Sequence, residues 1–186
     1  MTKINVGCGP TNFGPDWFHI GSAQHVQHHD INLELFENNT VDLIYASHLL
    51  EYFDREQAKE LLTRWFYKLV SGGTIRLSVP DFNVMSKLYQ EDKIELKDIL
   101  GPLYGKMYKG QELIYHKTVF DYKELSELLR EVGFENVKRY DYKETDHGHI
   151  DDCSHAHLPH DPQAIASGNF TDKHTLISLN IEAKKP

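Results

Sequence analysis

A β-strand, an amphipathic helix and a second β-strand follow one another between residues 41 and 79. The segment 41–47 reads Val-Asp-Leu-Ile-Tyr-Ala-Ser, the composition of a buried strand. Asp54 and Gln57 form a capping-box pattern that opens a helix, which ends before Ser71-Gly72-Gly73. Residues 74–79 then form a strand. Two strands joined by one helix lie parallel in one sheet. The pattern predicts an α/β fold, with a mostly parallel sheet and helices packed on its faces.

The rest of the chain repeats this alternation. Asp121 and Glu124 form a second capping-box pattern, and the helix that they open ends at Gly133. Between residues 82 and 115 we expect helical pieces broken at Gly101-Pro102 and at Gly110. Together with the two strands above, five further segments bring the expected strands to seven: residues 3–6, 17–20, 25–29, 137–142 and 176–183.

Composition fits one globular domain over residues 1–186, because 40% of the residues are hydrophobic and 26% are charged. The net charge of −8 argues against nucleic acid or an anionic membrane as a partner, since both require a basic surface. No membrane-length apolar run or signal-peptide pattern is present. With only two cysteines, Cys8 and Cys153, we expect reduced thiols and a cytoplasmic location.

The sequence Gly7-Cys8-Gly9-Pro10 directly follows the expected strand 3–6. Glycines at such a position let the backbone approach a ligand closely. Taken alone, a Gly-x-Gly turn is a weak signal and is often only a turn. Its position at the start of an ordered series of motifs gives it more weight.

That series contains Asn5-Val6-Gly7-Cys8-Gly9, then residues 41–53, the helix, and residues 69–77. It resembles the class I S-adenosylmethionine-dependent methyltransferases, and within them a short group of predicted methyltransferases. The resemblance spans most of the chain. It implies a Rossmann-like fold whose seven-stranded sheet has an antiparallel last strand, with S-adenosylmethionine as the cofactor and a small molecule as the substrate.

The resemblance also implies where the cofactor binds. The glycine turn would lie against its amino-acid part, Asp30 would meet the adenine amino group, and Ile31 would pack on the adenine ring. Ser47 and His48 would lie near the transferred methyl group. The expected cofactor-binding residues are Gly7, Cys8, Gly9, Pro10, Gly21, Ser22, Asp30, Ile31, Ser47 and His48. Asp30 could equally be an ordinary loop residue.

The chain departs from the family's pattern in two ways. The family carries an acid for the ribose at the end of the second strand, where this chain has Gly21-Ser22. In addition, Gly9 and Trp17 are too close together for a full helix between the first two strands. We therefore expect a fold that is abbreviated at its N-terminal side.

Two histidines and four polar residues are candidates for contact with the substrate. His48 and His116 could serve as the base for an oxygen acceptor, although His116 could instead be packed. The candidates for binding a polar substrate are Asp81, Asp151, Asp152 and Ser154. Asp81 could equally cap a helix. Glu51 fits a position at the pocket rim, or a structural one, better than a catalytic role.

A polar, histidine-rich loop extends from residue 145 to residue 174. His-x-His pairs place two imidazoles on one side of an extended chain, as zinc, nickel or iron sites require. The candidate ligands are His147, His149, His155 and His157, and the neighbouring His160 belongs to the same cluster. A solvated loop without a metal is the simpler interpretation.

Three functions follow from these patterns. The first is methyl transfer from S-adenosylmethionine to an oxygen or nitrogen of a small polar acceptor, for which the resemblance suggests a sugar or a polysaccharide precursor. The second is a non-catalytic module that binds the cofactor weakly or not at all, and the third is a metal-dependent enzyme built on the histidine-rich loop. The sequence leaves the oligomeric state open.

Overall fold

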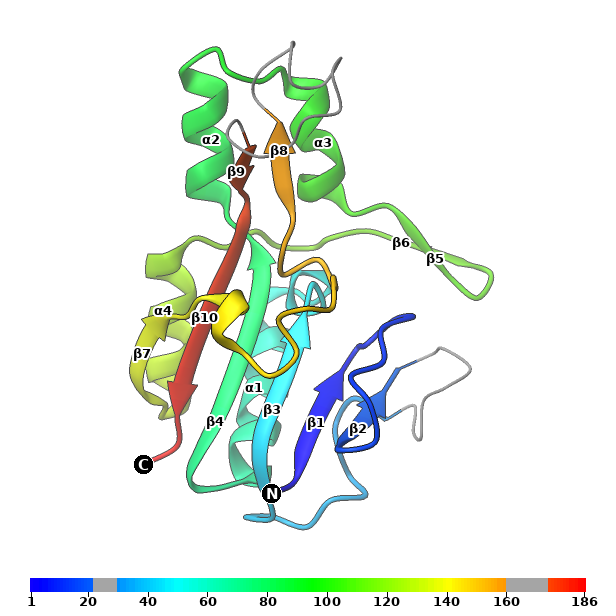
Figure 1. The fold of residues 1–186 in the computed structure, drawn as a ribbon, viewed down its shortest axis with the longest axis vertical. Helices are drawn as coiled ribbons and strands as arrows, with labels where there is room; N and C mark the ends of the chain where they lie inside the picture. The colour runs from blue at the N-terminus through cyan, green and yellow to red at the C-terminus, as the bar shows by residue number, and fades with distance from the viewer. Residues whose placement is uncertain (22–29, 160–173) are drawn as a thin grey trace.

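The computed structural model describes residues 1–21, 30–159 and 174–186. Its centre is a sheet with the strand order β2-β1-β3-β4-β10-β7 (Figure 1). The strands are β1 (Lys3–Val6), β2 (Trp17–Ile20), β3 (Val41–Ser47), β4 (Leu69–Pro80), β7 (Glu135–Arg139) and β10 (Ser178–Lys184).

The strand directions confirm a mostly parallel sheet with an antiparallel last strand. β2, β1, β3 and β4 are parallel to one another, whereas β10 lies antiparallel between β4 and β7. In the described part of the chain this sheet has six strands, so the expected seven is wrong. The strand expected at 25–29 lies outside the described residues.

The β3-α1-β4 unit forms as its sequence predicts. Asp54 accepts a hydrogen bond from the Gln57 amide (2.8 Å) and the Gln57 side chain returns one, so the capping box opens α1 (Arg55–Lys68). β4 starts at Leu69, five residues earlier than predicted, because the backbone becomes extended directly after the end of α1. A register shift in the β3–β4 pairing accommodates the extra residues.

The two faces of the sheet differ in what covers them. Ile44 and Ala46 of β3 belong to the main apolar core, together with residues of α1 and of α4 (Tyr122–Val132). Tyr45 and Ser47 of the same strand point to the opposite face, where both bond to Asp152. Both helices lie behind the sheet in Figure 1, and the chain between β7 and β8 crosses its front.

Helices thus cover one face of the sheet in the described part of the chain, which corrects the expectation of helices on both. No helix is found in the connection between β1 and β2, residues 7–16, which confirms the expected abbreviation. The other face is covered instead by a segment that we call the strap, residues 140–156, which includes the short 3-10 helix η2 (Tyr142–Glu144). The strap leads into β8 (His157–Pro159), which pairs with β9 (His174–Leu176).

Several elements lie beyond the carboxyl ends of the strands. They are the 3-10 helix η1 (Leu50–Tyr52), α2 (Phe82–Gln90), α3 (Leu96–Tyr104), and the hairpin of β5 (Met107–Lys109) and β6 (Glu112–Ile114). The expected break at Gly101-Pro102 is wrong, since α3 continues to Tyr104. Pro102 removes only one backbone donor, and the helix ends at Gly105, whose φ of 51° is left-handed. No helix among the described residues is long and apolar enough to cross a bilayer.

Candidate functional site

A cavity of about 410 Å³ opens at the carboxyl ends of β1, β2 and β3. Ligands of open α/β sheets bind at this edge. Each of the three strands contributes the residues that follow it, and the β5–β6 hairpin closes one side. The cavity is lined by Gly7, Gly9, Gly21, Ile31, His48, Leu49, Tyr52, Phe53, Met107 and Ile114.

The glycine turn is tied to β2 and packed against the segment after β3. The amides of Gly7 and Cys8 both donate to the Ile20 carbonyl, at 2.7 and 3.2 Å. Gly7 has a φ of +73°, and a Cβ there would lie 2.7 Å from a methyl group of Leu49. Gly9 has a φ of +52°, and its Cβ direction is open. Only glycine suits both positions, because one lacks space and both are left-handed.

The cavity brings together half of the residues predicted for the cofactor, namely Gly7, Gly9, Gly21, Ile31 and His48. Cys8, Pro10, Asp30 and Ser47 are not among its lining residues, and Ser22 lies outside the described residues.

Asp30 and Ser47 have other partners in this structure. The Asp30 carboxylate accepts hydrogen bonds from the amides of Asn32 (2.9 Å) and Glu34 (2.8 Å), so it stabilises its own turn. The Ser47 hydroxyl donates to the Asp152 carbonyl (2.7 Å) on the strap side of the sheet. The adenine role of Asp30 stays a prediction.

Behind the cavity, His48 and His116 meet the carboxyl group of Glu51. Glu51 lies in η1 and is 1% exposed. Its Oε1 is 3.4 Å from Nδ1 of His48 and 3.8 Å from Nε2 of His116. Glu51 was not predicted to have a chemical role. The only sequence signal for Glu51 is its position four residues after β3. That position does not reveal that the segment after β6 brings His116 to the same carboxyl group.

Burial shifts the protonation of all three groups. It raises the pKa of Glu51 to about 8. Burial, together with the nearby His116, lowers the pKa of His48 to about 4. Burial also lowers the pKa of His116, although the hydrogen bond of this ring to the Pro102 carbonyl acts in the opposite direction. Glu51 and His48 are strongly perturbed groups at the cavity, and such groups gather at functional sites.

None of the four residues predicted for substrate binding lines this cavity. Asp81 is buried, accepts a hydrogen bond from the Val84 amide at the start of α2, and pairs with Arg139 at 3.1 Å. The Asp152 carboxylate accepts a hydrogen bond from Tyr45 and the Ser154 carbonyl accepts one from Asn180, so both hold the strap on the sheet, while exposed Asp151 accepts one from the amide of Cys153. The geometry therefore gives these residues structural contacts, and their role in binding a substrate stays a prediction.

The candidate metal ligands are dispersed. His147 is 2% exposed and stacks on Phe13, with ring centroids 4.3 Å apart. His155 stacks on Tyr142 at 3.9 Å, whereas His149 and His157 are exposed. His160 lies outside the described residues. Within the described ranges, no group of three or more His, Cys, Asp or Glu side chains is placed to hold a metal ion.

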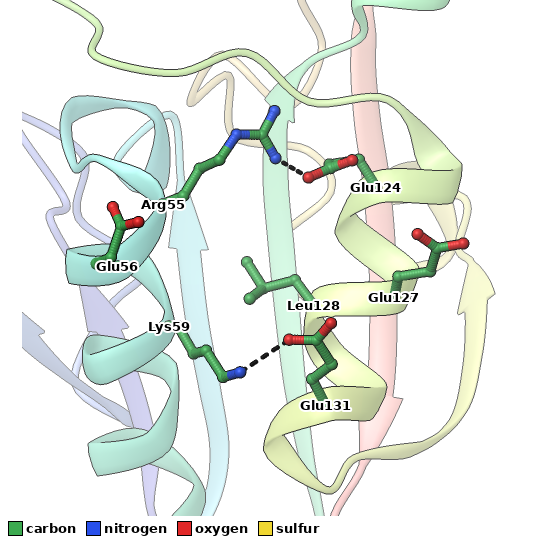
Figure 2. Close-up of a pocket in the computed structure, with 7 residues that line it drawn as sticks. All are labelled: Arg55, Glu56, Lys59, Glu124, Glu127, Leu128 and Glu131. Atoms are coloured by element: carbon green, nitrogen blue, oxygen red, sulfur yellow. Dashed lines mark hydrogen bonds and ion pairs between the residues drawn. The ribbon is translucent and has the colours of Figure 1, made fainter.

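A second hollow lies between α1 and α4 (Figure 2). Charged side chains line it, and they pair with one another: Arg55 with Glu124, and Lys59 with Glu131 at 2.8 Å. Half-exposed pairs of this kind hold two helices together weakly, and nothing in the groove points to chemistry.

No protein-family model matches the chain, and no curated protein sequence matches it. Solved structures match over its whole length. A methyltransferase of Thermotoga maritima, titled S-adenosylmethionine-dependent and a possible histamine N-methyltransferase, is 12% identical with a TM-score of 0.59, over 100% of this chain and 82% of that chain.

Two archaeal S-adenosylmethionine-dependent methyltransferases are also similar. That of Archaeoglobus fulgidus is 16% identical with a TM-score of 0.57, over 99% of this chain and 86% of that chain. That of Methanosarcina mazei is 16% identical with a TM-score of 0.54, over 99% and 92%. At such identities the likeness concerns the fold. The chain has the Rossmann-like fold of class I S-adenosylmethionine-dependent methyltransferases.

Proposed function

We propose that the protein is an S-adenosylmethionine-dependent methyltransferase whose cofactor occupies the cavity at the ends of β1, β2 and β3. One observation carries the proposal: a glycine turn after β1 forms the wall of a cavity in a chain with this fold. The acceptor that we propose is a small polar molecule methylated on oxygen or nitrogen, for which a sugar or a polysaccharide precursor is one candidate.

The residues present fit this cofactor in most respects. The volume of about 410 Å³ is in the range of cofactor pockets. The open side of Gly9 leaves room against the backbone, and Ile31 and Phe53 offer apolar surface for an adenine ring. The ribose would lack the family's carboxylate, because Gly21 stands at that place. When bound, the cofactor supplies an electrophilic methyl group on its sulfonium.

The chain's own residues would orient the acceptor and exclude water. Of the two predicted bases, only His48 lines the cavity, while His116 lies behind Tyr52 with its ring edge-on, at a centroid distance of 4.6 Å. Met107 and Ile114 place the β5–β6 hairpin over the same cavity. The hairpin would therefore shield the reacting groups from solvent.

Calorimetry with S-adenosylmethionine and S-adenosylhomocysteine tests the proposal. We expect binding of both, and a loss of about tenfold or more in Gly9→Ala, because Gly9 lines the cavity and an added methyl group takes up space beside its backbone. Gly72→Ala is the matched control, since Gly72 also has a positive φ and open space but lies at an exposed position of β4, outside the residues that line the cavity. No binding of either compound at millimolar concentration would exclude the proposed function.

A second candidate is a non-catalytic module that binds the cofactor weakly. Two observations favour it: the connection after β1 contains no helix, and Gly21 replaces the ribose acid. A lost charged hydrogen bond costs about 1.5–3 kcal/mol, which is about tenfold to a hundredfold in affinity.

Gly21→Asp separates the two candidates. A gain of about tenfold or more over a weak wild-type affinity would indicate a degraded site, whereas micromolar binding by the wild type would eliminate this second candidate. Asn38→Asp, which adds the same charge at an exposed position away from the cavity, is the control.

A further inference from the structure

Glu51 is a buried acid whose oxygens have no hydrogen-bond partner among the described residues. The nearest titratable groups are the rings of His48 and His116, which approach the same oxygen, Oε1, at 3.4 and 3.8 Å. Buried carboxyl groups without partners are rare, because desolvation of the charged form is costly. The hydrogen bonds on the far sides of the two rings show which form the acid takes.

The contacts of Ser178 determine the tautomer of His48. The Ser178 hydroxyl donates its only proton to the Cys153 carbonyl at 2.6 Å. It can therefore only accept from Nε2 of His48, which lies 3.0 Å away. Nε2 thus carries a proton, and in the neutral ring Nδ1 carries a lone pair. That lone pair is on the side of Glu51.

A backbone carbonyl determines the tautomer of His116. Nδ1 of His116 lies 2.9 Å from the Pro102 carbonyl oxygen, which can only accept. Nδ1 therefore carries the proton, and Nε2 of the neutral ring presents its lone pair to Glu51. Two lone pairs, from rings in opposite tautomers, face one carboxyl oxygen.

We infer that Glu51 is a protonated acid in the folded protein at neutral pH, and that its proton faces the lone pairs of the His48 and His116 rings, which are held in opposite tautomers. An ionised carboxylate would place an anion against two lone pairs in a buried site. The alternative, an imidazolium beside a carboxylate, would bury two charges instead of none. Only the neutral acid supplies the missing donor.

The other polar groups near Glu51 do not favour its ionisation. Burial, and after it the nearby Glu51, raises the pKa of Tyr52 in η1, and the Tyr52 hydroxyl donates to the Gly105 carbonyl. From the strap, burial and the neighbouring acids raise the pKa of Cys153. The Lys117 amide donates to the Glu51 carbonyl, but its ammonium group bonds to Gln57. No lysine or arginine in the described part of the chain forms an ion pair with Glu51.

Asp152 is the remaining anion on this side. It acts electrostatically on His48, and its own carboxylate is engaged by Tyr45 and Ser154. The backbone amide of Glu51 itself favours the charged form, but burial outweighs it. Burial, the largest influence, is what raises the pKa of Glu51 to about 8.

Glu51 is thus a positioning residue that acts through His48, which lines the cavity. This consequence rests on the proposed function, but the proton on Glu51 does not. While Glu51 is protonated, neither nitrogen of His48 is available as a base, since one carries a proton and the other faces the acid. When Glu51 is ionised, Glu51 and His48 together can accept one proton. A reaction that needs a base would therefore accelerate as pH rises towards 8.

Nitrogen NMR of the histidine rings in the unliganded protein is the direct test. At pH 7 we expect two neutral rings, His48 protonated on Nε2 and His116 on Nδ1, assigned with His48→Gln and His116→Gln. Glu51→Gln and Glu51→Leu should both keep these tautomers, because Ser178 and the Pro102 carbonyl determine them. An imidazolium at either position, or the reverse tautomers, would overturn the inference.

Thermal unfolding gives a second measurement. The pKa of Glu51 is higher in the folded chain than in the unfolded chain, so the wild type loses stability as pH rises from about 4.5 to about 8. Relative to Glu51→Gln, the Tm of the wild type should fall by about 5 °C or more over that range. Glu56→Gln, at an exposed site on α1, should show no such trend.

A Tm difference that is constant with pH would contradict the inference even if Glu51→Leu did not fold. Both measurements use the protein without a ligand, so they fail separately from the cofactor proposal. Loss of cofactor binding with the expected tautomers intact would reject the proposed function and leave the proton site standing.

Discussion

The two faces of the central sheet are stabilised by different physics. Behind the sheet, alternate strand residues such as Ile44, Leu77 and Ile181 pack on α1 and α4 in one apolar core. In front, the intervening residues are largely polar, and the strap is held on them by hydrogen bonds from Tyr45, Ser47 and Asn180. Burial of apolar surface stabilises the face covered by helices, and hydrogen bonds stabilise the face covered by the strap.

This difference explains how the fold tolerates its shortened first connection. A chain without a helix between β1 and β2 must cover the front of the sheet by other means. The strap does so with Asp152 as its main anchor, because its carboxylate accepts from Tyr45 and from both the amide and the hydroxyl of Ser154. A small aromatic cluster of Phe13, Trp17 and Tyr45 adds apolar contact.

The largest expected effect is on the helix face. Trp65 of α1 is fully buried, and its indole donates to the Ile31 carbonyl at 2.7 Å. Trp65→Ala should destabilise the protein by about 3–5 kcal/mol, measured by denaturant unfolding. Tyr67→Ala, at a 56% exposed position of the same helix, is the control. Equal costs for both variants would refute the apolar basis of this face.

Removal of the strap's anchor should have a smaller and more local effect. Asp152→Ala loses the three hydrogen bonds described above, which we expect to cost about 2–3 kcal/mol. Hydrogen exchange should accelerate in residues 140–156 while α1 and α4 remain protected. Asp151→Ala removes a neighbouring exposed acid and should change neither region. If α1 and α4 lost protection together with the strap, the two faces would not be separable.

The strap face should also be the acid-sensitive one. His147 is buried against Phe13 and Tyr45, and burial lowers its pKa to about 4. The unfolded chain binds this proton more readily, so stability is lost as pH falls from about 6.5 towards 4.

His147→Phe should remove that loss. Its Tm relative to the wild type should rise by about 3 °C per pH unit below pH 6.5, measured by scanning calorimetry. Substitution of the exposed His149 by Phe serves as the control. If the Tm difference between His147→Phe and the wild type did not change with pH, His147 would not be buried in its neutral form.

The smallest effect is expected on the outer surface of the helix layer. Lys59 and Glu131 pair at 2.8 Å and are both half-exposed (Figure 2). Lys59→Ala should cost about 0.5 kcal/mol in thermal unfolding and less at high salt. A cost above that of Asp152→Ala would mean that the α1–α4 contact depends on charge rather than on its apolar core.

Much of the fold could be predicted because its signals are local. The β3-α1-β4 unit and the end of α4 at Gly133 follow from periodicity and capping residues that are neighbours in sequence. The predictions were wrong where contacts between residues far apart in the sequence determine the structure. α3 continues through Pro102, and the front of the sheet is covered by a segment that no periodic pattern marks.

The candidate site was predicted in part. The turn at Gly7 and Gly9, and His48 after β3, were identifiable because they follow strands whose carboxyl ends must meet. The acidic partner of the two histidines could not be identified. Glu51 is an unremarkable glutamate in sequence, and its character comes from complete burial and from a ring brought in from residue 116.

The sequence by itself determined the order of the strands and helices and the edge of the sheet at which a ligand would bind, since local hydrophobic pattern and turn chemistry specify both. Only the tertiary structure decided which face of the sheet carries helices, that Asp152 and Ser154 anchor a strap, and that His48, Glu51 and His116 share one site. Those outcomes depend on burial and hydrogen-bond direction between residues far apart in the chain, and these are properties of the folded molecule alone.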